Sequence, residues 1–427
     1  MSPNRRIRPS PRTLFFAMLL YAVSFVKFFD RDPLSAQVGQ QGPIELALLV
    51  TVAVTLIVAF HRHFGKLVVA PSAKAFLVFG AIAMVSSVFS FYPLLSLAKG
   101  LSFILVCTIA IVASSAYKPD RVIKYLYYSI VMILGIELAV GIVGGRPLLD
   151  IDDYSGRARL SLFGLHPTLL GELSAVTLLL GFLLSKRPPL CYQVFLFAVA
   201  IASGSRAGAT LLVVILLAML LAFVWRNLRS VALGCCLGSL FACMFVGIRV
   251  NDRPFVDIAS IDRPLYGDTL ARDLPTFNGR TDVWKAATPA LAHSVFLGYG
   301  LGGARDVLVN NTSWDWEAGD SHNALIDLIL AGGFPAVLIF LLGWAGAVRR
   351  AFRSRGSLRI AALAIYAYIV GFGIVAPNLT NLQALSTFLI IMVDAMICAN
   401  VVLSPARGPL AGVAATSEDS LENPIGT

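Results

Sequence analysis

The chain has 427 residues, of which 57% are hydrophobic and only 14% are charged. Soluble domains usually carry about 25% charged residues, so the composition excludes an ordinary soluble protein. Repeated apolar runs of bilayer-crossing length indicate a polytopic membrane protein instead. The formal net charge of +10 therefore has to be interpreted through membrane topology before any acidic partner is considered.

Twelve apolar runs follow one another along the chain. The first continues into "FVKFFDRD" without a small-residue cleavage site, so we expect a retained span and no signal peptide. The seventh and eighth runs are divided by "ASGSRAG", whose two glycines favour a tight turn. The predicted spans are 13–29, 44–60, 75–91, 97–116, 122–143, 168–185, 190–203, 207–224, 231–248, 323–345, 360–376 and 383–403.

Lys and Arg are distributed unequally between alternating loops. If the N-terminus is cytoplasmic, the inside segments hold 19 basic residues and the short outside segments hold 6. By the positive-inside rule, this excess places both termini in the cytoplasm. The segment 348–359, "VRRAFRSRGSLR", is therefore interpreted as a cytoplasmic anchor and not as a nucleic-acid patch.

One outer segment, 249–322, is far longer and more polar than the other loops, with seven basic and ten acidic residues. Loops of this length are usually functional or disordered. Within it, "TDVWKAATPALAH" predicts a short amphipathic helix. The predicted organisation is a cytoplasmic N-terminus (1–12), transmembrane helices 1–9 (13–248), a large periplasmic loop (249–322), transmembrane helices 10–12 (323–403) and a disordered cytoplasmic tail (404–427).

Cofactor and metal sites are not indicated. All six cysteines lie in apolar runs, where a cysteine behaves as a small buried hydrophobe, and no zinc-ligand spacing is present. No Gly-rich nucleotide-binding loop follows a predicted strand. We therefore expect no cofactor and no metal.

Three groups on the predicted outer side call for an explanation: Arg206 in "SGSRAG", Arg280 in "FNGRTDVW" and His322 in "GDSHNALID". Each has a structural alternative, because arginines near span ends extend to lipid head groups and a histidine can simply begin a helix. Arginine presents a planar fork of donors that suits phosphate oxygens, and histidine can accept a proton from a hydroxyl near neutral pH. Together they could displace a lipid diphosphate with an alcohol.

At these motifs the chain resembles the O-antigen ligase and O-antigen polymerase superfamily, which includes lipopolysaccharide O-antigen ligases and exopolysaccharide polymerases. The matching segments are "SGSRAG", "NGRTDVWKAA…HSVFLGYGLGG" and "SHNALIDLILAGGFPAVLIF", in this order and separated by the large outer loop. The segment "RLSLFGLHPTLLGE" resembles a further part of the family. The resemblance covers about 160–390, while the first 150 residues match by hydropathy alone.

The resemblance implies an all-α, membrane-embedded, GT-C-like glycosyltransferase of the bacterial inner membrane, with a periplasmic active site and an inverting, metal-independent mechanism. It implies a glycan donor on undecaprenyl diphosphate and an acceptor that is either lipid A–core or a lipid-linked glycan. The family's functional residues correspond to His322, Arg280 and Arg206. His322 would deprotonate or orient the acceptor hydroxyl, and the two arginines would bind the diphosphate.

Seven further residues are candidates for substrate binding. We expect acidic side chains to orient the histidine and an arginine, tryptophans to stack on sugar rings, and outer arginines to shape the acceptor entrance, although tryptophans are also common membrane-interface anchors. These residues are Asp320, Asn323, Asp282, Trp284, Trp316, Arg157 and Arg159. Glu137 and Asp394, which lie inside spans, are interpreted as interhelical hydrogen-bonding residues.

Two alternatives stay open from the sequence. Ligase and polymerase use the same donor, so the motifs do not separate them. The sequence does not specify the glycan, the linkage, the acceptor, the oligomeric state or the role of the tail. A transporter or flippase would need ionisable residues along a mid-membrane path, often with paired broken helices. The sparse acids within the spans argue against that second alternative. The expected partners are membrane lipids and lipid-linked glycans, without nucleic acid.

Overall fold

The computed structural model describes most of the predicted membrane region and part of the large loop. The described residues are 10–26, 41–61, 69–144, 149–152, 157–160, 167–203, 205–225, 280–293, 296–303, 307, 321, 323–374 and 384–402. The predicted span 231–248 and the tail 404–427 lie outside them.

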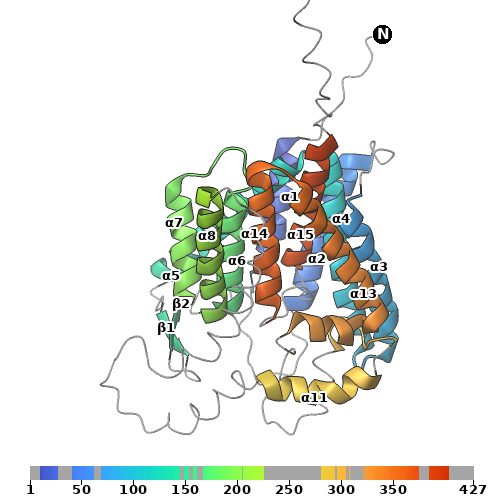
Figure 1. Cartoon of the computed structure of the whole chain (residues 1–427). Helices are drawn as coiled ribbons and strands as arrows, with labels where there is room; N and C mark the ends of the chain where they lie inside the picture. Colours follow the sequence, from blue (N-terminus) through green and yellow to red (C-terminus); the bar gives the residue numbers. More distant parts are fainter. Residues whose placement is uncertain are drawn as a thin grey trace, which may run out of the picture.

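A bundle of apolar helices forms the body of the molecule (Figure 1). Every predicted span in the described part of the chain is helical, so the all-helical membrane architecture is confirmed there. The helices are α1 (Pro11–Val23), α2 (Gln41–Phe60), α3 (Pro71–Ser86), α4 (Pro93–Ala116), α5 (Pro119–Val143), α6 (Pro167–Gly181), α7 (Leu190–Ala202), α8 (Arg206–Trp225), α13 (Ala324–Arg353), α14 (Gly356–Gly373) and α15 (Leu385–Val402).

Proline determines where several of these helices begin. Helices α1, α3, α4 and α5 each carry a proline in the first turn. Proline suits this position because the first N–H groups of a helix have no partner within it. Hydropathy does not register this effect, so the predicted spans began a few residues too late. Lys99 was counted among the six basic residues of the short outside segments, although the predicted span 97–116 includes it. It lies within α4 and is half-buried.

Six helices are long and apolar enough to cross a membrane, namely α2, α3, α4, α5, α13 and α14, with α3 extended by the 3-10 turn η2 (Ser87–Phe89). Five further apolar helices of the described chain, α1, α6, α7, α8 and α15, have shorter apolar segments. A helix rises about 1.5 Å per residue, so a 13-residue helix spans roughly 20 Å of an apolar layer about 30 Å thick. The chain is thus membrane-embedded, and the count of twelve spans stays a prediction.

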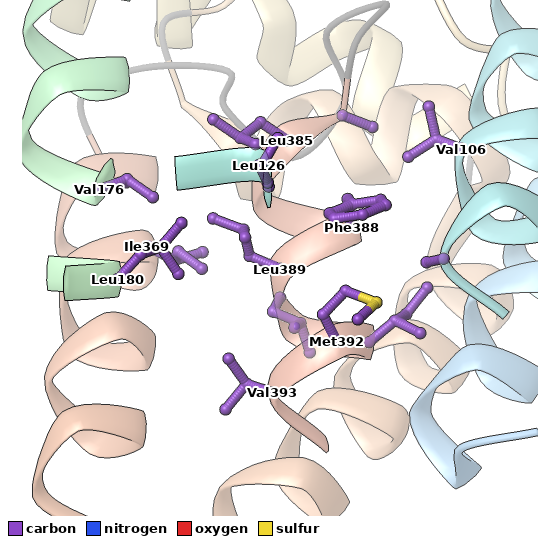
Figure 2. Close-up of a cluster of buried hydrophobic side chains, with 14 of the residues drawn as sticks. Val106, Leu126, Val176, Leu180, Ile369, Leu385, Phe388, Leu389, Met392 and Val393 are labelled. Carbon is purple, nitrogen blue, oxygen red and sulfur yellow. The ribbon is translucent and has the colours of Figure 1, made fainter. Parts of the chain in front are cut away.

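Helix α15 lies at the centre of the hydrophobic core. Its residues Leu385, Phe388, Leu389, Met392 and Val393 are all buried and pack against apolar side chains of α4, α5, α6 and α14 (Figure 2). Small residues allow close helix contacts elsewhere, as membrane helices commonly require. A Cβ placed on Gly343 of α13 would lie 2.5 Å from the Cβ of Ala75 on α3.

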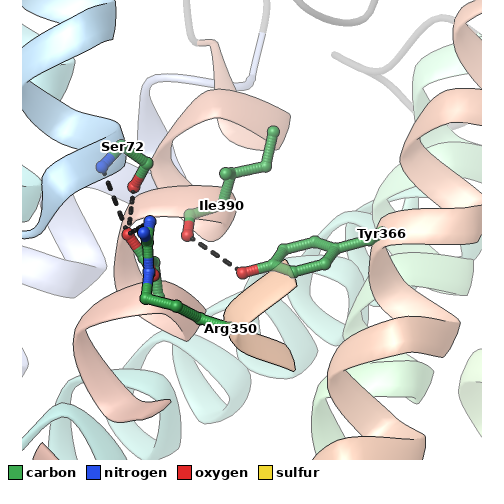
Figure 3. A network of polar contacts seen from close by, with 5 residues as sticks. Ser72, Arg350, Tyr366 and Ile390 are labelled. Carbon is green, nitrogen blue, oxygen red and sulfur yellow. Dashed lines mark hydrogen bonds and ion pairs between the residues drawn. The ribbon is translucent and has the colours of Figure 1, made fainter. Parts of the chain in front are cut away.

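A buried ion pair joins three helices at the end of the bundle opposite α11, a helix of the large loop (Arg280–His293). The guanidinium of Arg350 on α13 donates to the two carboxylate oxygens of Asp394 on α15, at 2.5 and 2.7 Å. Ser72, in the first turn of α3, donates to the same carboxylate through its backbone N–H and its hydroxyl (Figure 3). The interpretation of Asp394 as an interhelical hydrogen-bonding residue is therefore confirmed.

Two elements of the polar segments lie at the other end of the bundle, which we call the α11 end (Figure 1). Helix α11 confirms the helix predicted from "TDVWKAATPALAH". The second element is a two-stranded antiparallel hairpin of β1 (Leu149–Asp152) and β2 (Arg157–Leu160), which hydropathy did not predict. Helix α11 lies in the long polar segment 249–322, whereas the hairpin lies in a segment that was counted among the short outside ones.

Candidate active site at the α11 end

Asn323 fixes the beginning of α13. Its side-chain carbonyl accepts hydrogen bonds from the backbone N–H groups of Leu325 and Ile326, at 3.0 and 3.2 Å, which is a regular N-cap. Its side-chain amide donates to the carbonyl oxygen of Ile374, the residue that caps the end of α14, at 3.4 Å. One side chain therefore joins the start of α13 to the end of α14.

Ser321 is held as firmly, from the other side of position 322. It is fully buried, and its carbonyl oxygen accepts a hydrogen bond from Nε1 of Trp284 on α11, at 3.0 Å. Its backbone N–H donates to the carboxylate of Asp327, one turn into α13, at 3.2 Å. The residues on both sides of His322 are thus anchored to three helices, although His322 itself lies outside the described residues.

The first part of α13 is a separate arm. Gly333 has φ 74° and ψ 175°, which breaks the helix after about two turns. The carbonyl oxygens of Leu330 and Ala331, left without a helical partner by the break, accept hydrogen bonds from the backbone N–H groups of Tyr299 and Gly300, at 2.6 and 3.0 Å. The arm is therefore held at both ends, by Asn323 and by the segment around Gly300.

Helix α11 packs against this arm. Its Ala287 and Ala290 form a small apolar cluster with Leu330 of α13 and Val307, and Trp284 packs at the edge of that cluster. Arg280 is the first residue of α11 and precedes Trp284 by one helical turn. The start of α11 is therefore brought to the segment that carries position 322.

The start of α8 reaches the same place from another direction. A Cβ placed on Gly208 would lie 3.2 Å from the ring of Phe372 and 3.3 Å from the hydroxyl of Tyr368, both on the last turns of α14. Arg206 is the first residue of α8, two residues before this contact. The end of α14 is consequently contacted by both the start of α8 and the start of α13.

The described structure therefore brings together the backbone positions of the predicted catalytic motifs, while their side chains lie beyond what it describes. Only the backbone is described for Arg206, Arg280 and Asp282. His322, Asp320 and Trp316 lie outside the described residues. Asn323 and Trp284 are described, and their polar groups make the hydrogen bonds given above.

The predicted acceptor-binding arginines lie on the hairpin. The strand register pairs Asp150 with Arg159 and Asp152 with Arg157. Opposite charges at facing positions of an antiparallel pair stabilise a hairpin. This register offers both arginines a structural role that the sequence reasoning did not consider, and their role in substrate binding stays a prediction.

Glu172 is among the buried acids at this end that were missed from the sequence. Glu172 on α6 is 4% exposed, and its carboxylate accepts a hydrogen bond from the hydroxyl of Ser386 on α15, at 3.2 Å. An acid inside an apolar run is by default a candidate functional residue, so its position in the span 168–185 was a usable indication. Within the described ranges, His, Cys, Asp and Glu side chains form no group of three that could hold a metal ion.

Comparison with known proteins supports the resemblance found in the motifs. The family model described as O-antigen ligase matches residues 191–341, from α7 to the middle of α13. This segment contains Arg206, Arg280 and His322. A search of curated proteins finds no match. Residues 191–341 of this membrane-embedded chain are thus similar to the O-antigen ligase family.

Proposed function

We propose that the protein is a glycosyltransferase that moves a glycan from an undecaprenyl-diphosphate donor onto an acceptor hydroxyl at the α11 end. The family match supports membrane glycosyltransferase activity of the O-antigen ligase or polymerase type in general. The acceptor is lipid A–core for a ligase and a lipid-linked glycan for a polymerase.

One observation carries the proposal to a particular site. The starts of α8 and α13 both contact the end of α14, and α11 is bonded through Trp284 to the residue before position 322. Three motifs that are far apart in the sequence thus have neighbouring backbones. Such convergence is what a reaction with two phosphate-binding cations and one base requires.

The proposed reaction is a single displacement at C1 of the first sugar. The acceptor oxygen forms a bond to C1 while the bond between C1 and the diphosphate oxygen breaks, which inverts the anomeric configuration. His322 receives the acceptor's proton or orients its hydroxyl. Arg206 and Arg280 bind the diphosphate and stabilise the negative charge that develops as it leaves. The energy is supplied by the donor, and the proposed mechanism is independent of metal ions.

The acidic and aromatic candidates have supporting roles. We assign Asp320 to orienting His322 and Asp282 to holding Arg280. Trp316 is assigned to stacking on a sugar ring. Trp284 has a half-buried indole that is bonded to Ser321, so any stacking on its ring has to be compatible with that bond.

Three polar candidates complete the assignment. The side-chain carbonyl of Asn323 already accepts two hydrogen bonds, so a sugar hydroxyl would have to use its remaining amide hydrogen. Arg157 and Arg159 are assigned to the acceptor entrance on the hairpin. We propose that the α11 end faces the periplasm, with both termini in the cytoplasm and the protein in the inner membrane.

A glycan gel tests the proposal. A deletion strain is complemented with wild type, His322→Ala, Arg280→Ala or Arg206→Ala, and protein levels are compared by immunoblot. His61→Ala and Arg187→Ala serve as matched controls, because both residues are exposed and lie away from the α11 end. We expect wild type and the controls to restore long surface glycan and the three site variants to fail.

The deletion phenotype separates the remaining possibilities. Intact lipid-linked chains that never reach lipid A–core indicate a ligase, and single repeat units indicate a polymerase. Full complementation by the site variants would refute the proposed site and favour a transporter or flippase.

A further inference from the structure

Glu172 is buried where three helices meet at the α11 end. It lies in the second turn of α6, is 4% exposed and accepts a hydrogen bond from the hydroxyl of Ser386 in the first turn of α15. An ionised carboxylate in an apolar bundle is strongly disfavoured unless a cation or several donors offset the loss of water. The position of Glu172 is therefore compatible with a counter-charge, with several donors or with a neutral carboxyl.

The neighbouring residue contacts the turn that leads into α8. A Cβ placed on Gly171 would lie 2.6 Å from the Ser203 hydroxyl and 2.9 Å from the Cβ of Ser205. Arg206 follows Ser205 directly and begins α8. Only glycine at position 171 allows α6 to approach this turn so closely. The approach places the start of α6, which carries Glu172, against the turn that directly precedes the arginine.

The charge pattern points the same way. Arg206 lies at the end of the bundle that the positive-inside rule predicts to be poor in basic residues, so a basic residue there needs its own reason. A buried acid on the helix that packs against the turn before Arg206 supplies one. Each group makes the charged form of the other more favourable, because opposite charges within a few ångströms attract strongly in a low-dielectric interior.

We propose that Glu172 is a positioning residue that acts through Arg206: its carboxylate is the counter-ion that orients the guanidinium towards the diphosphate. Arginine has five N–H donors, so an arginine held by a carboxylate on one side keeps donors for phosphate oxygens on the other. Ser386 orients the carboxylate in turn. The inference deepens the proposed function and rests on it.

A double-mutant cycle tests the inference, because residues that act through each other give non-additive losses. The variants are Glu172→Gln, Arg206→Gln and the combination, purified in lipid nanodiscs. Two properties are measured: kcat/KM for glycan transfer, and the Kd for undecaprenyl diphosphate. Glu137→Gln is the matched control, since Glu137 is also a buried acid within a span, on α5.

We expect Arg206→Gln to lower kcat/KM by about 100-fold, the size of effect that follows loss of a correctly placed group. Glu172→Gln is expected to lower kcat/KM by at least ~10-fold and to weaken diphosphate binding, while Glu172→Asp recovers part of both. The combined variant should be no worse than Arg206→Gln alone. Adding Glu137→Gln to Arg206→Gln should change neither kcat/KM nor the Kd for undecaprenyl diphosphate.

Two results would overturn the inference and leave the proposed function intact: wild-type values for Glu172→Gln, or losses that multiply in the combined variant. If Arg206→Gln alone changes neither property, the proposed function itself is wrong at this residue and the inference is refuted with it. Should Glu172→Gln fail to accumulate, Ser386→Ala replaces it in the cycle. If Ser386→Ala lowers kcat/KM only when Arg206 is present, the inference is supported. If Ser386→Ala lowers kcat/KM equally with and without Arg206→Gln, the inference is refuted.

Discussion

The hydrogen bond between Trp284 and Ser321 leads to the most direct prediction about the site. Trp284→Phe keeps an aromatic ring in the α11 cluster but removes the donor, which leaves the buried carbonyl of Ser321 without this partner. A lost hydrogen bond of this kind costs about 1–2 kcal/mol, because a buried acceptor is expensive to leave unpaired. Such a change raises the population in which α11 is undocked by roughly 5- to 30-fold.

Hydrogen exchange measured by mass spectrometry on the protein in nanodiscs reads this population directly. We expect faster exchange in peptides covering α11 and 321–327, with unchanged exchange in α15. Glycan transfer should fall in parallel, since the residues beside His322 lose one of their anchors. An exchange pattern identical to wild type would refute the idea that this bond docks α11.

Trp344 offers a matched control for this experiment. It is also half-buried, but its indole N–H has no hydrogen-bond partner within the described residues. Replacing a buried donor that has no partner is neutral or stabilising. Trp344→Phe should therefore leave exchange and transfer at wild-type values. A similar loss in both variants would show that ring size, and not the hydrogen bond, determines the effect.

Three further predictions concern the stability and shape of the bundle. Asp394→Ala removes the buried partner of a guanidinium that is 27% exposed, so we expect about 3 kcal/mol lower unfolding free energy in mixed micelles; an unchanged denaturation midpoint would contradict this. Gly343→Ala overpacks the contact with α3 and should lower thermal stability by about 1–3 kcal/mol, whereas Gly135→Ala, with no atom within 4 Å of the new Cβ, should raise it. Gly300 has φ +80°, and a Cβ on it would lie 2.8 Å from the backbone of the 3-10 turn; Gly356 has φ +65°, but a Cβ on it would have no atom within 4 Å. Gly300→Ala should therefore impair glycan transfer more than Gly356→Ala. Equal transfer activity of the two variants would exclude a role for the crowding at Gly300.

Hydropathy predicted the helices because burial in lipid selects long apolar runs, but it failed where backbone conformation matters. The run 323–345 was predicted as one span without a break, yet α13 breaks at Gly333. The letters "AGGFP" carry the indication, since paired glycines and a proline weaken a helix. An average over many residues cannot register a break made by a single φ angle.

The hairpin was missed for a related reason. The sequence "LDID…RARL" alternates apolar and charged residues around a polar turn, which favours paired strands, but it is too short and too polar to stand out in a search for spans. Glu172 could have been noticed as an acid inside an apolar run, but its contacts could not be predicted. Its neighbours come from α15 and from the turn before α8, far away in the sequence.

The candidate site could be predicted as motifs but not as geometry. Arg206, Arg280 and His322 were identified from the short segments that surround them. The sequence offered no way to see that Asn323 bonds to the end of α14, or that Trp284 anchors the residue before His322. These contacts depend on the relative placement of three helices, which is decided by packing across the whole bundle.

The break in α13 has a consequence for how the site responds to the surrounding bilayer. A helix accommodates a thinner membrane chiefly by tilting, and a continuous helix tilts as one rigid body, so every position along it moves. Gly333 interrupts that rigid coupling, and the bonds to Tyr299 and Gly300 hold the arm independently. A tilt of the long section of α13 is therefore not transmitted through a continuous helix to the residues next to His322.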